Sequence, residues 1–330
     1  MASDNLLLKA ETSLSNMRVA EALRLFEMAD AADCGADACA AGRWHCHMLN
    51  GSFEKAWLES DAIARRGSPD PYRFWDGKRV DGQRIIIRCI HGLGDTIQFI
   101  RFAPLIRRTA RSVVIEAQPL LKSLLAASNL ADDVITWSDA PPEWDQQIEV
   151  MELPRVFRAT LDSIPNRVPY LHVPAQRLSR NGRLRVAIAW ASGAYNPARS
   201  IPVSQMSELF TVLGVSFVSV QAGQERAQLA PWSAQIPSLY KESDSVLSTA
   251  ENLANVDLVI SVDTMVAHLA GAMALPVWIL LPFECDWRWM LDRDDSPWYP
   301  TMRLFRQPQP GDWGSVIRRV RHALIREASS

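Results

Sequence analysis

The segment at residues 91–96 reads HGLGDT and follows a β-branched run at residues 84–90. Gly92 and Gly94 let the backbone approach a ligand closely, and the start of the next helix offers free amide groups to an anion. Asp95 lies at that helix start, where it can accept the proton of an attacking hydroxyl. Capping of the helix is the simpler role for Asp95, and the pattern does not favour either the capping role or the proton-accepting role. The third glycine of a dinucleotide fingerprint is missing, which disfavours a dehydrogenase.

A second segment, residues 261–271, reads SVDTMVAHLAG and also joins an apolar run to a helix. Asp263 and Thr264 fall at the junction. The amides of Thr264 and Met265, together with the helix dipole, suit a diphosphate without a metal ion. His268 lies one turn later on the same face and can reach the same ligand. A lone histidine on a helix is, however, more often a core or capping residue.

Two further strand ends carry polar candidates. Ser192, Gly193 and Arg199 follow the apolar run at residues 184–190, and Gln221 ends the next one. The planar guanidinium of Arg199 can pair with phosphate oxygens. A solvated loop arginine is an equally good interpretation.

The tail at residues 286–307 reads DWRWMLDRDDSPWYPTMRLFRQ and is rich in tryptophan and arginine. Aromatic faces suit sugar rings and nucleobases, which makes Trp287 and Trp298 candidates for contact with a sugar or an acceptor. Apolar packing explains such residues equally well. The net charge of −2 and the lack of a long basic stripe argue against nucleic acid.

Alternating strands and helices connect these segments and predict a parallel, doubly wound sheet in each half. The pattern starts at residue 84, is interrupted by proline-bearing irregular sequence up to about residue 181, and then restarts. The sequence therefore predicts two Rossmann-like halves that face a cleft. Expected strands are 84–90, 112–117, 133–137, 184–190, 215–221, 256–262 and 276–281; expected helices are 96–109, 119–127, 203–213, 246–255, 264–274 and 312–326.

Residues 17–67 read as helices with a tight glycine turn and small residues at the crossings, a pattern that resembles tetratricopeptide repeats. A single repeat cannot bury its own apolar face, so it is expected to pack on the next domain. An ordinary helical extension is the alternative. The predicted domains are a helical module at 1–73, an N-terminal Rossmann-like domain at 74–180, a C-terminal one at 181–310, and a final helix at 311–330.

The bulk composition is that of a globular protein, with 330 residues, 48% hydrophobic and 22% charged. The N-terminus lacks the pattern of a signal peptide, and no apolar run approaches the roughly 18 residues of a membrane span. We therefore expect a cytoplasmic protein, or one peripheral at the inner membrane. The five cysteines are irregularly spaced, with no paired C-x-x-C. No metal site and no cofactor are predicted.

Three runs together resemble a known family: HGLGDTIQFIRFAPLIRR, SVDTMVAHLAGAMALPVWILLP and the tryptophan-rich tail. They are similar to the C-terminal region of bacterial tetratricopeptide-repeat proteins. Those proteins are related to the lipopolysaccharide heptosyltransferases and, more distantly, to O-linked N-acetylglucosamine transferases. The resemblance covers about residues 40–325 and implies the two-domain GT-B fold.

The resemblance also implies roles. The N-terminal half would hold the acceptor, with Asp95 in the place of the proposed base. The C-terminal half would hold a nucleotide-diphosphate sugar through an Asp-Thr-Gly-x-x-His element, which corresponds to residues 263–268, with Met265 replacing the glycine. Arg199 would be the basic residue after the first strand, although the loop at 193–197 reads GAYNP where relatives have a longer one. Gln221 would begin the nucleotide-facing loop.

The predicted function is inverting, metal-independent transfer of a sugar from a nucleotide-diphosphate donor to a glycan or protein acceptor. A protein partner bound through the helical module is a further expectation. Two alternatives remain. The first is a non-catalytic scaffold that binds nucleotide-sugars or retains only the fold, suggested by Met265 and the altered loop. The second is a sugar-nucleotide epimerase of similar architecture.

Overall fold

The computed structural model describes residues 2–67, 75–173, 182–193, 196–241 and 245–329. The predicted domain limits at 73/74 and 180/181 fall outside these ranges, as do Ala194 and Tyr195 of the loop after the fourth predicted strand. The chain forms two compact units. Unit 1 comprises residues 1–78, 152–164 and 283–293, and unit 2 comprises residues 79–151, 165–282 and 294–330.

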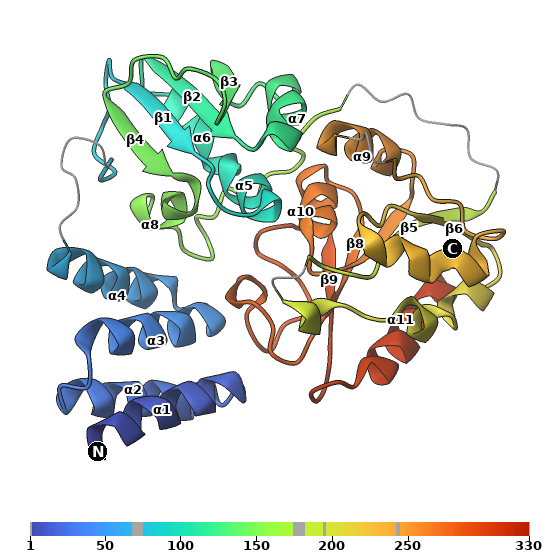
Figure 1. Ribbon diagram of the computed structural model, residues 1–330, viewed down its shortest axis with the longest axis horizontal. Helices are drawn as coiled ribbons and strands as arrows, with labels where there is room; N and C mark the ends of the chain where they lie inside the picture. The colour runs from blue at the N-terminus through green and yellow to red at the C-terminus, as the bar shows by residue number, and fades with distance from the viewer. Residues whose placement is uncertain (1, 68–74, 174–181, 194–195, 242–244, 330) are drawn as a thin grey trace. The chain divides into compact units, whose positions relative to one another are not determined.

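Unit 2 contains a four-stranded parallel sheet in the order β3-β2-β1-β4 (Figure 1). The predicted helix at 96–109 is divided by a 3₁₀ turn at residues 100–102, because Pro104 lacks the N–H that would continue the α-helical ladder. The sequence prediction missed β4. The bounds are β1 Arg84–Arg88, α5 Leu93–Phe99, α6 Ala103–Arg107, β2 Ser112–Ala117, α7 Lys122–Ala127, β3 Asp133–Thr136 and β4 Gln146–Glu149.

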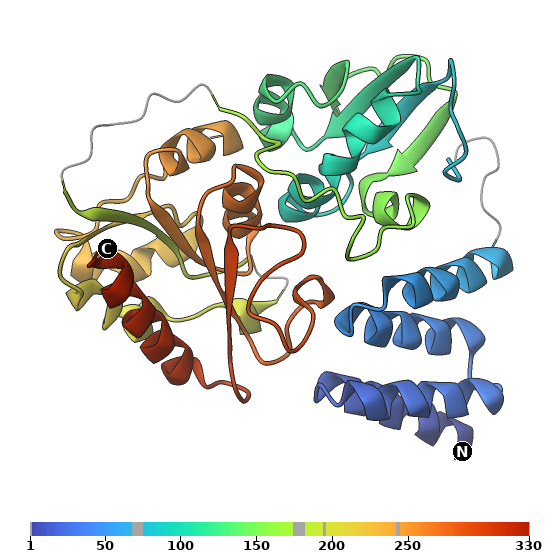
Figure 2. The ribbon, with the colours of Figure 1, turned by 180° about the vertical axis from the view of Figure 1, so that it is seen from behind.

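The second sheet of unit 2 is parallel throughout, in the order β6-β5-β7-β8-β9. Figure 2 shows the ribbon from behind. Every residue of β7 and β8 is buried, as the apolar runs predicted. The prediction of a helix at 203–213 is wrong, because this segment forms two 3₁₀ turns, at 203–206 and 209–211. The bounds are β5 Leu184–Ala189, β6 Val215–Ser219, α9 Val246–Leu253, β7 Leu258–Val262, α10 Met265–Ala272, β8 Val277–Leu281, β9 Met302–Arg306 and α11 Trp313–Ala328.

Unit 1 begins with four helices, α1 Ala2–Ser15, α2 Val19–Ala31, α3 Ala36–Leu49 and α4 Phe53–Arg66, of which α1 was not predicted. Gly42 allows α2 and α3 to cross closely, since a Cβ there would lie 2.2 Å from the ring of Phe26. Arg43 joins α3 to α4 through a bidentate pair with Glu59, at 2.7 and 2.8 Å.

The helices of unit 1 also pack on two segments from later in the chain. Trp57 donates its indole N–H to the Ala159 carbonyl at 2.7 Å, and the Leu291 amide donates to the Leu49 carbonyl at 3.0 Å. Both contacts lie within unit 1, so the expectation that the helical module packs on the next domain stays a prediction. No helix in the described ranges is both long and apolar enough to cross a membrane.

The cysteines give a test of this packing. Burial raises the pKa of the Cys46 thiol to about 12, and Cys39, Cys89 and Cys285 are also buried, whereas Cys34 is half-buried. We expect iodoacetamide at pH 8 to modify only Cys34 rapidly in the native protein. Mass spectrometry after timed quenching measures this, with the guanidinium-unfolded chain, in which all five react, as the control. Rapid labelling of Cys46 would contradict the packing of α3.

Candidate functional site

The two glycine- and aspartate-bearing motifs meet inside unit 2, where α5 packs against α10. A Cβ on Gly94 would lie 3.0 Å from His268 Cδ2 and 3.7 Å from Met265 Cα. The backbone of the first motif therefore touches the helix of the second. The two elements are in contact at this point, which leaves no room for a ligand between Gly94 and α10.

Asp95 caps α5. The amide of Gly92 donates to Asp95 Oδ2 at 3.0 Å, and the side chain is half-buried. The capping interpretation is thus confirmed. Capping also holds the carboxylate at the positive end of the helix, at the carboxyl edge of the first sheet, where open α/β folds bind ligands. The role of Asp95 as a base stays a prediction.

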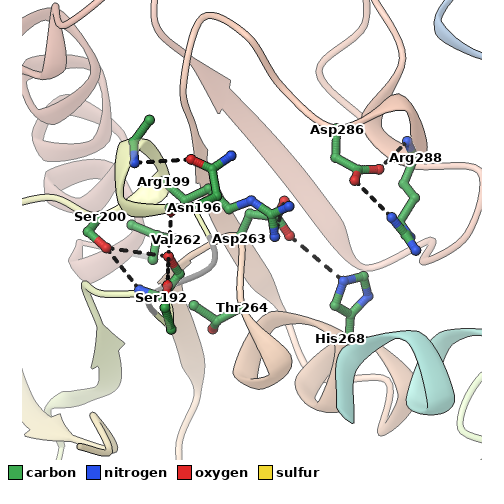
Figure 3. Close-up of polar contacts among 12 residues, drawn as sticks. Ser192, Asn196, Arg199, Ser200, Val262, Asp263, Thr264, His268, Asp286 and Arg288 are labelled. Atoms are coloured by element: carbon green, nitrogen blue, oxygen red, sulfur yellow. Dashed lines mark hydrogen bonds and ion pairs between the residues drawn. The ribbon is translucent and has the colours of Figure 1, made fainter. Parts of the chain in front are cut away.

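Asp263 lies at the centre of the second motif, just after β7 (Figure 3). Its Oδ2 lies 3.5 Å from Arg199 Nη1, and its Oδ1 lies 3.8 Å from His268 Nε2. Only 4% of Asp263 is exposed. Because an isolated carboxylate is costly to bury, the nearby guanidinium of Arg199 helps to offset its charge. Three predicted residues are thereby brought together.

Thr264 caps α10, since its Oγ1 accepts from the Val266 amide at 3.3 Å and lies 3.2 Å from Ser261 Oγ. The hydroxyl is therefore directed at the protein. Met265, the first residue of α10, is half-buried, and its Cα faces Gly94. The first residue of α10 therefore lies against the motif that contains Asp95.

The loop after β5 is closed by side chains. The Ser192 amide donates to Ser200 Oγ at 3.0 Å, and Ser192 Oγ donates to the Asn196 carbonyl at 2.9 Å. These bonds position the 3₁₀ turn at 197–199 that carries Arg199. Gly193 is exposed, and a Cβ there would meet nothing within 4 Å.

Gln221 does not present its side chain to a ligand, contrary to its predicted donor-binding role. Its Oε1 accepts from the amides of Trp190 and Ala191, both at 2.9 Å, and its Nε2 donates to the carbonyls of Ala191 and Ala222. These four bonds use the full capacity of the amide group. The side chain instead ties the end of β5 to the end of β6.

The two predicted sugar-binding tryptophans are covered by protein, which corrects that prediction. Trp298 is fully buried and packs edge-to-face on Phe99, with ring centroids 5.6 Å apart. Trp287, in unit 1, packs on Trp44 at 5.5 Å and beneath the guanidinium of Arg288 at 4.9 Å. Burial of such large apolar surfaces is worth several kcal/mol, and the packing interpretation prevails.

Sequence reasoning missed three buried side chains near α10: Arg101, Tyr170 and Tyr299. His268 Nδ1 lies 3.0 Å from the hydroxyl of Tyr299, and Arg101 lies over the rings of Tyr170 and Tyr299, at 4.7 and 4.6 Å. Burial raises the pKa of Tyr299 well above its ordinary value, so this phenol stays protonated. Nothing in the local sequence distinguishes these residues from core residues, because the contact joins four separate segments.

Comparison with known proteins supports the fold. No family model matches the chain. Protein FlbA of Caulobacter vibrioides is 26% identical over 298 residues, which cover 78% of this chain and 48% of FlbA. The chain thus spans about half the length of the curated relative it matches.

Two solved structures are similar over about three quarters of the chain. The E. coli ADP-heptose lipopolysaccharide heptosyltransferase II has a TM-score of 0.54 and 13% identity, and covers 75% of this chain and 100% of its own. The glycosyl transferase family 9 protein of Veillonella parvula has a TM-score of 0.56 and 12% identity, and covers 77% of this chain and 100% of its own. The chain has the GT-B type of α/β fold, with two parallel sheets and a helical N-terminal module.

The contact at Gly94 can be tested by adding one methyl group. Gly94→Ala is expected to destabilise the protein by about 1–3 kcal/mol, because the new Cβ overpacks the ring of His268 and the backbone of α10. Denaturant unfolding measures the difference, with Gly193→Ala as the matched control, since a Cβ at Gly193 meets nothing. Equal stability of the two variants would show that α5 does not contact α10 at Gly94.

Proposed function

We propose that the chain is a glycosyltransferase that moves a sugar from a nucleotide-diphosphate donor to a hydroxyl of a glycan or protein acceptor. We further propose that transfer inverts the configuration at the anomeric carbon and uses neither a metal ion nor another cofactor. The observation that carries the proposal is the contact between α5, which begins with the motif of Asp95, and α10, at whose start Asp263 lies near Arg199 and His268. The fold is shared with heptosyltransferases.

In the proposed reaction, Asp95 takes the proton of the acceptor hydroxyl while its oxygen attacks the anomeric carbon. The bond from that carbon to the diphosphate breaks, and the diphosphate leaves with the electron pair. Amides at the start of α10 and the guanidinium of Arg199 would stabilise the new negative charge. In this proposal, a helix dipole and one arginine supply the positive charge that a divalent ion supplies in metal-dependent enzymes.

Asp95→Asn tests the base. The amide oxygen of asparagine can still accept from the Gly92 N–H, so the helix cap and the fold are retained while the basic oxygen is lost. We expect the turnover number to fall by roughly 10²–10⁴-fold with donor affinity unchanged. Transfer of label from nucleotide-sugars to polysaccharide and protein fractions measures turnover, with the exposed Asp133→Asn as control. A fully active Asp95→Asn enzyme would remove Asp95 from the base role.

The acceptor side of the proposal rests on three exposed apolar residues at the carboxyl ends of neighbouring strands. Ile90 follows β1, Leu120 follows β2 and Trp137 follows β3, and each is more than half exposed. The loops are tied together, because Gln118 Nε2 donates to the His91 carbonyl at 2.7 Å. We propose that an acceptor sugar stacks on Trp137 beside the motif of Asp95.

Trp137→Ala tests this surface. Loss of the stacking face is expected to raise the KM for the acceptor about tenfold, which corresponds to about 1.4 kcal/mol, and to leave binding of the donor unchanged. Initial rates at varied acceptor concentration measure the effect. Leu213→Ala, which removes a highly exposed apolar residue after the second 3₁₀ turn, is the control. An unchanged KM would place the acceptor elsewhere.

A non-catalytic scaffold is the second candidate, because Met265 and the close contact at Gly94 both narrow the space at the start of α10. Calorimetric titration separates the two, since a scaffold without a donor site shows no affinity for nucleotide-sugars at millimolar concentration.

For the helical module we propose a tetratricopeptide-like surface for a protein partner. The proposed location is the cytoplasm or the inner face of the inner membrane.

A further inference from the structure

The outer face of α11 is the most basic helical surface in the part of the chain that the structure describes. The helix carries four arginines against one acidic residue, Glu327. Among the described helices only α4 comes near, with three basic residues that are balanced by three acidic ones. Residues 301–330 hold six arginines and two acidic residues, although the whole chain has a net charge of −2. Positive charge is therefore concentrated at this end of unit 2.

The helical spacing of α11 separates an apolar face from a charged one. The apolar side chains join the core cluster on one face of the second sheet (Figure 1): Trp313, Val316, Ile317, Val320, Ala323 and Leu324. The opposite face is exposed and carries Arg318, Arg319, His322, Ile325 and Arg326, with Arg321 half-buried at its border. Because the sheet covers the apolar face, the basic face is what the helix presents to a partner.

The first two arginines of this face are oriented by neutral oxygens. Arg318 Nη2 donates to Ser315 Oγ at 2.9 Å. Arg319 donates through Nε to the Ser315 carbonyl at 3.4 Å and through Nη2 to the Arg306 carbonyl. These bonds hold the guanidinium groups without compensating for their charge. Each guanidinium has five N–H donors, so donors are left for the oxygens of an anionic ligand.

The acidic side chains near this face are fewer than the arginines. Asp312 caps α11 by accepting from the Ser315 amide at 3.0 Å, and Glu327 lies in the last turn. Glu208 precedes the 3₁₀ turn at 209–211, which shares the core cluster with α11. Three carboxylates thus stand against the four arginines of the helix and the two of β9, and the surface keeps its positive sign.

We propose that the exposed face of α11, residues 318–326, docks on a bilayer surface that contains anionic lipids. Arginines bind phosphate oxygens in pairs, and four of them on one amphipathic helix suit a negatively charged membrane. The segment spans about 12 Å along a convex helix, which suits a flat surface. Ile325 is 40% exposed among these charges, where an apolar side chain can enter the headgroup boundary. This inference rests on the proposed location at the inner membrane and is independent of the proposed transfer reaction.

Single-stranded nucleic acid is the less suitable partner for the same charge. Its binding sites combine a basic groove with aromatic side chains on which bases stack. The one aromatic residue of α11, Trp313, is buried in the core cluster, and the basic residues follow a convex helix rather than a groove.

Sedimentation of the full chain with vesicles tests the surface. At about 0.1 M salt we expect binding to phosphatidylcholine vesicles that contain phosphatidylglycerol, and none to phosphatidylcholine alone. Salt at about 1 M should release the chain, because the screening length falls from about 10 Å to about 3 Å. Arg318→Gln combined with Arg319→Gln should lower the partition coefficient about 30-fold, which corresponds to about 1 kcal/mol for each charge.

Arg108→Gln combined with Arg111→Gln is the matched control, because both side chains are exposed and the change in charge is the same. This pair should bind like the wild type. Equal weakening by the two pairs would show that net charge rather than α11 attracts the chain, which overturns the proposal. So would binding to both kinds of vesicle alike, or to neither. Thermal unfolding checks that both pairs retain the fold.

Arginine modification of the wild-type chain gives a second measurement that needs no variant. Anionic vesicles should protect Arg318 and Arg319 from phenylglyoxal and leave Arg108 reactive, as peptide mass spectrometry measures. Vesicle binding with α11 unprotected overturns the assignment. Release by millimolar glycerol phosphate would mean a pocket for one phosphate, and protection by a DNA duplex but not by vesicles would mean a nucleic-acid surface; either result overturns it as well. No readout uses a sugar donor, so failure here leaves the proposed transfer untouched.

Discussion

The buried carboxylate of Asp263 constrains the arrangement of the candidate site. A charge with so little access to water has to be compensated, and Arg199 provides the positive partner. Hydrogen bonds of Ser192, Ser200 and Asn196 help to hold the segment that carries Arg199. The ion pair thus links the end of β7 to the segment after β5.

Helix α10 is fixed from two sides by glycines. Gly94 brings the backbone of α5 against the ring of His268, and Gly271 brings the ring of Tyr299 against α10 itself. Between these contacts His268 has little freedom to rotate, and its ring is held before any ligand arrives. The proposed glycosyl transfer would benefit from such preorganisation.

The sequence predicted those parts of the fold that depend on local apolar patterns. The buried strands β7 and β8 and the two motifs at their carboxyl ends are the clearest cases. It missed β4, in which only Ile148 is fully buried, because a polar edge strand carries almost no apolar signal. Trp298 was assigned to a sugar because its residue type suits such a contact, and Gln221 was assigned to the donor because it ends a predicted strand. Their actual partners are distant in sequence and were not accessible to local reasoning.

Partners that are distant in sequence also explain why the sequence predicted the helical module as a separate domain. Residues 283–293 connect β8 to β9, yet they belong to the unit of the N-terminal helices, where Trp287 packs on Trp44 and Leu291 binds the backbone of Leu49. Residues 152–164 join this unit in the same way, through Trp57. Removal of the helices would leave the buried face of the β8–β9 connection without its cover. The helical module is therefore part of what holds that connection in place.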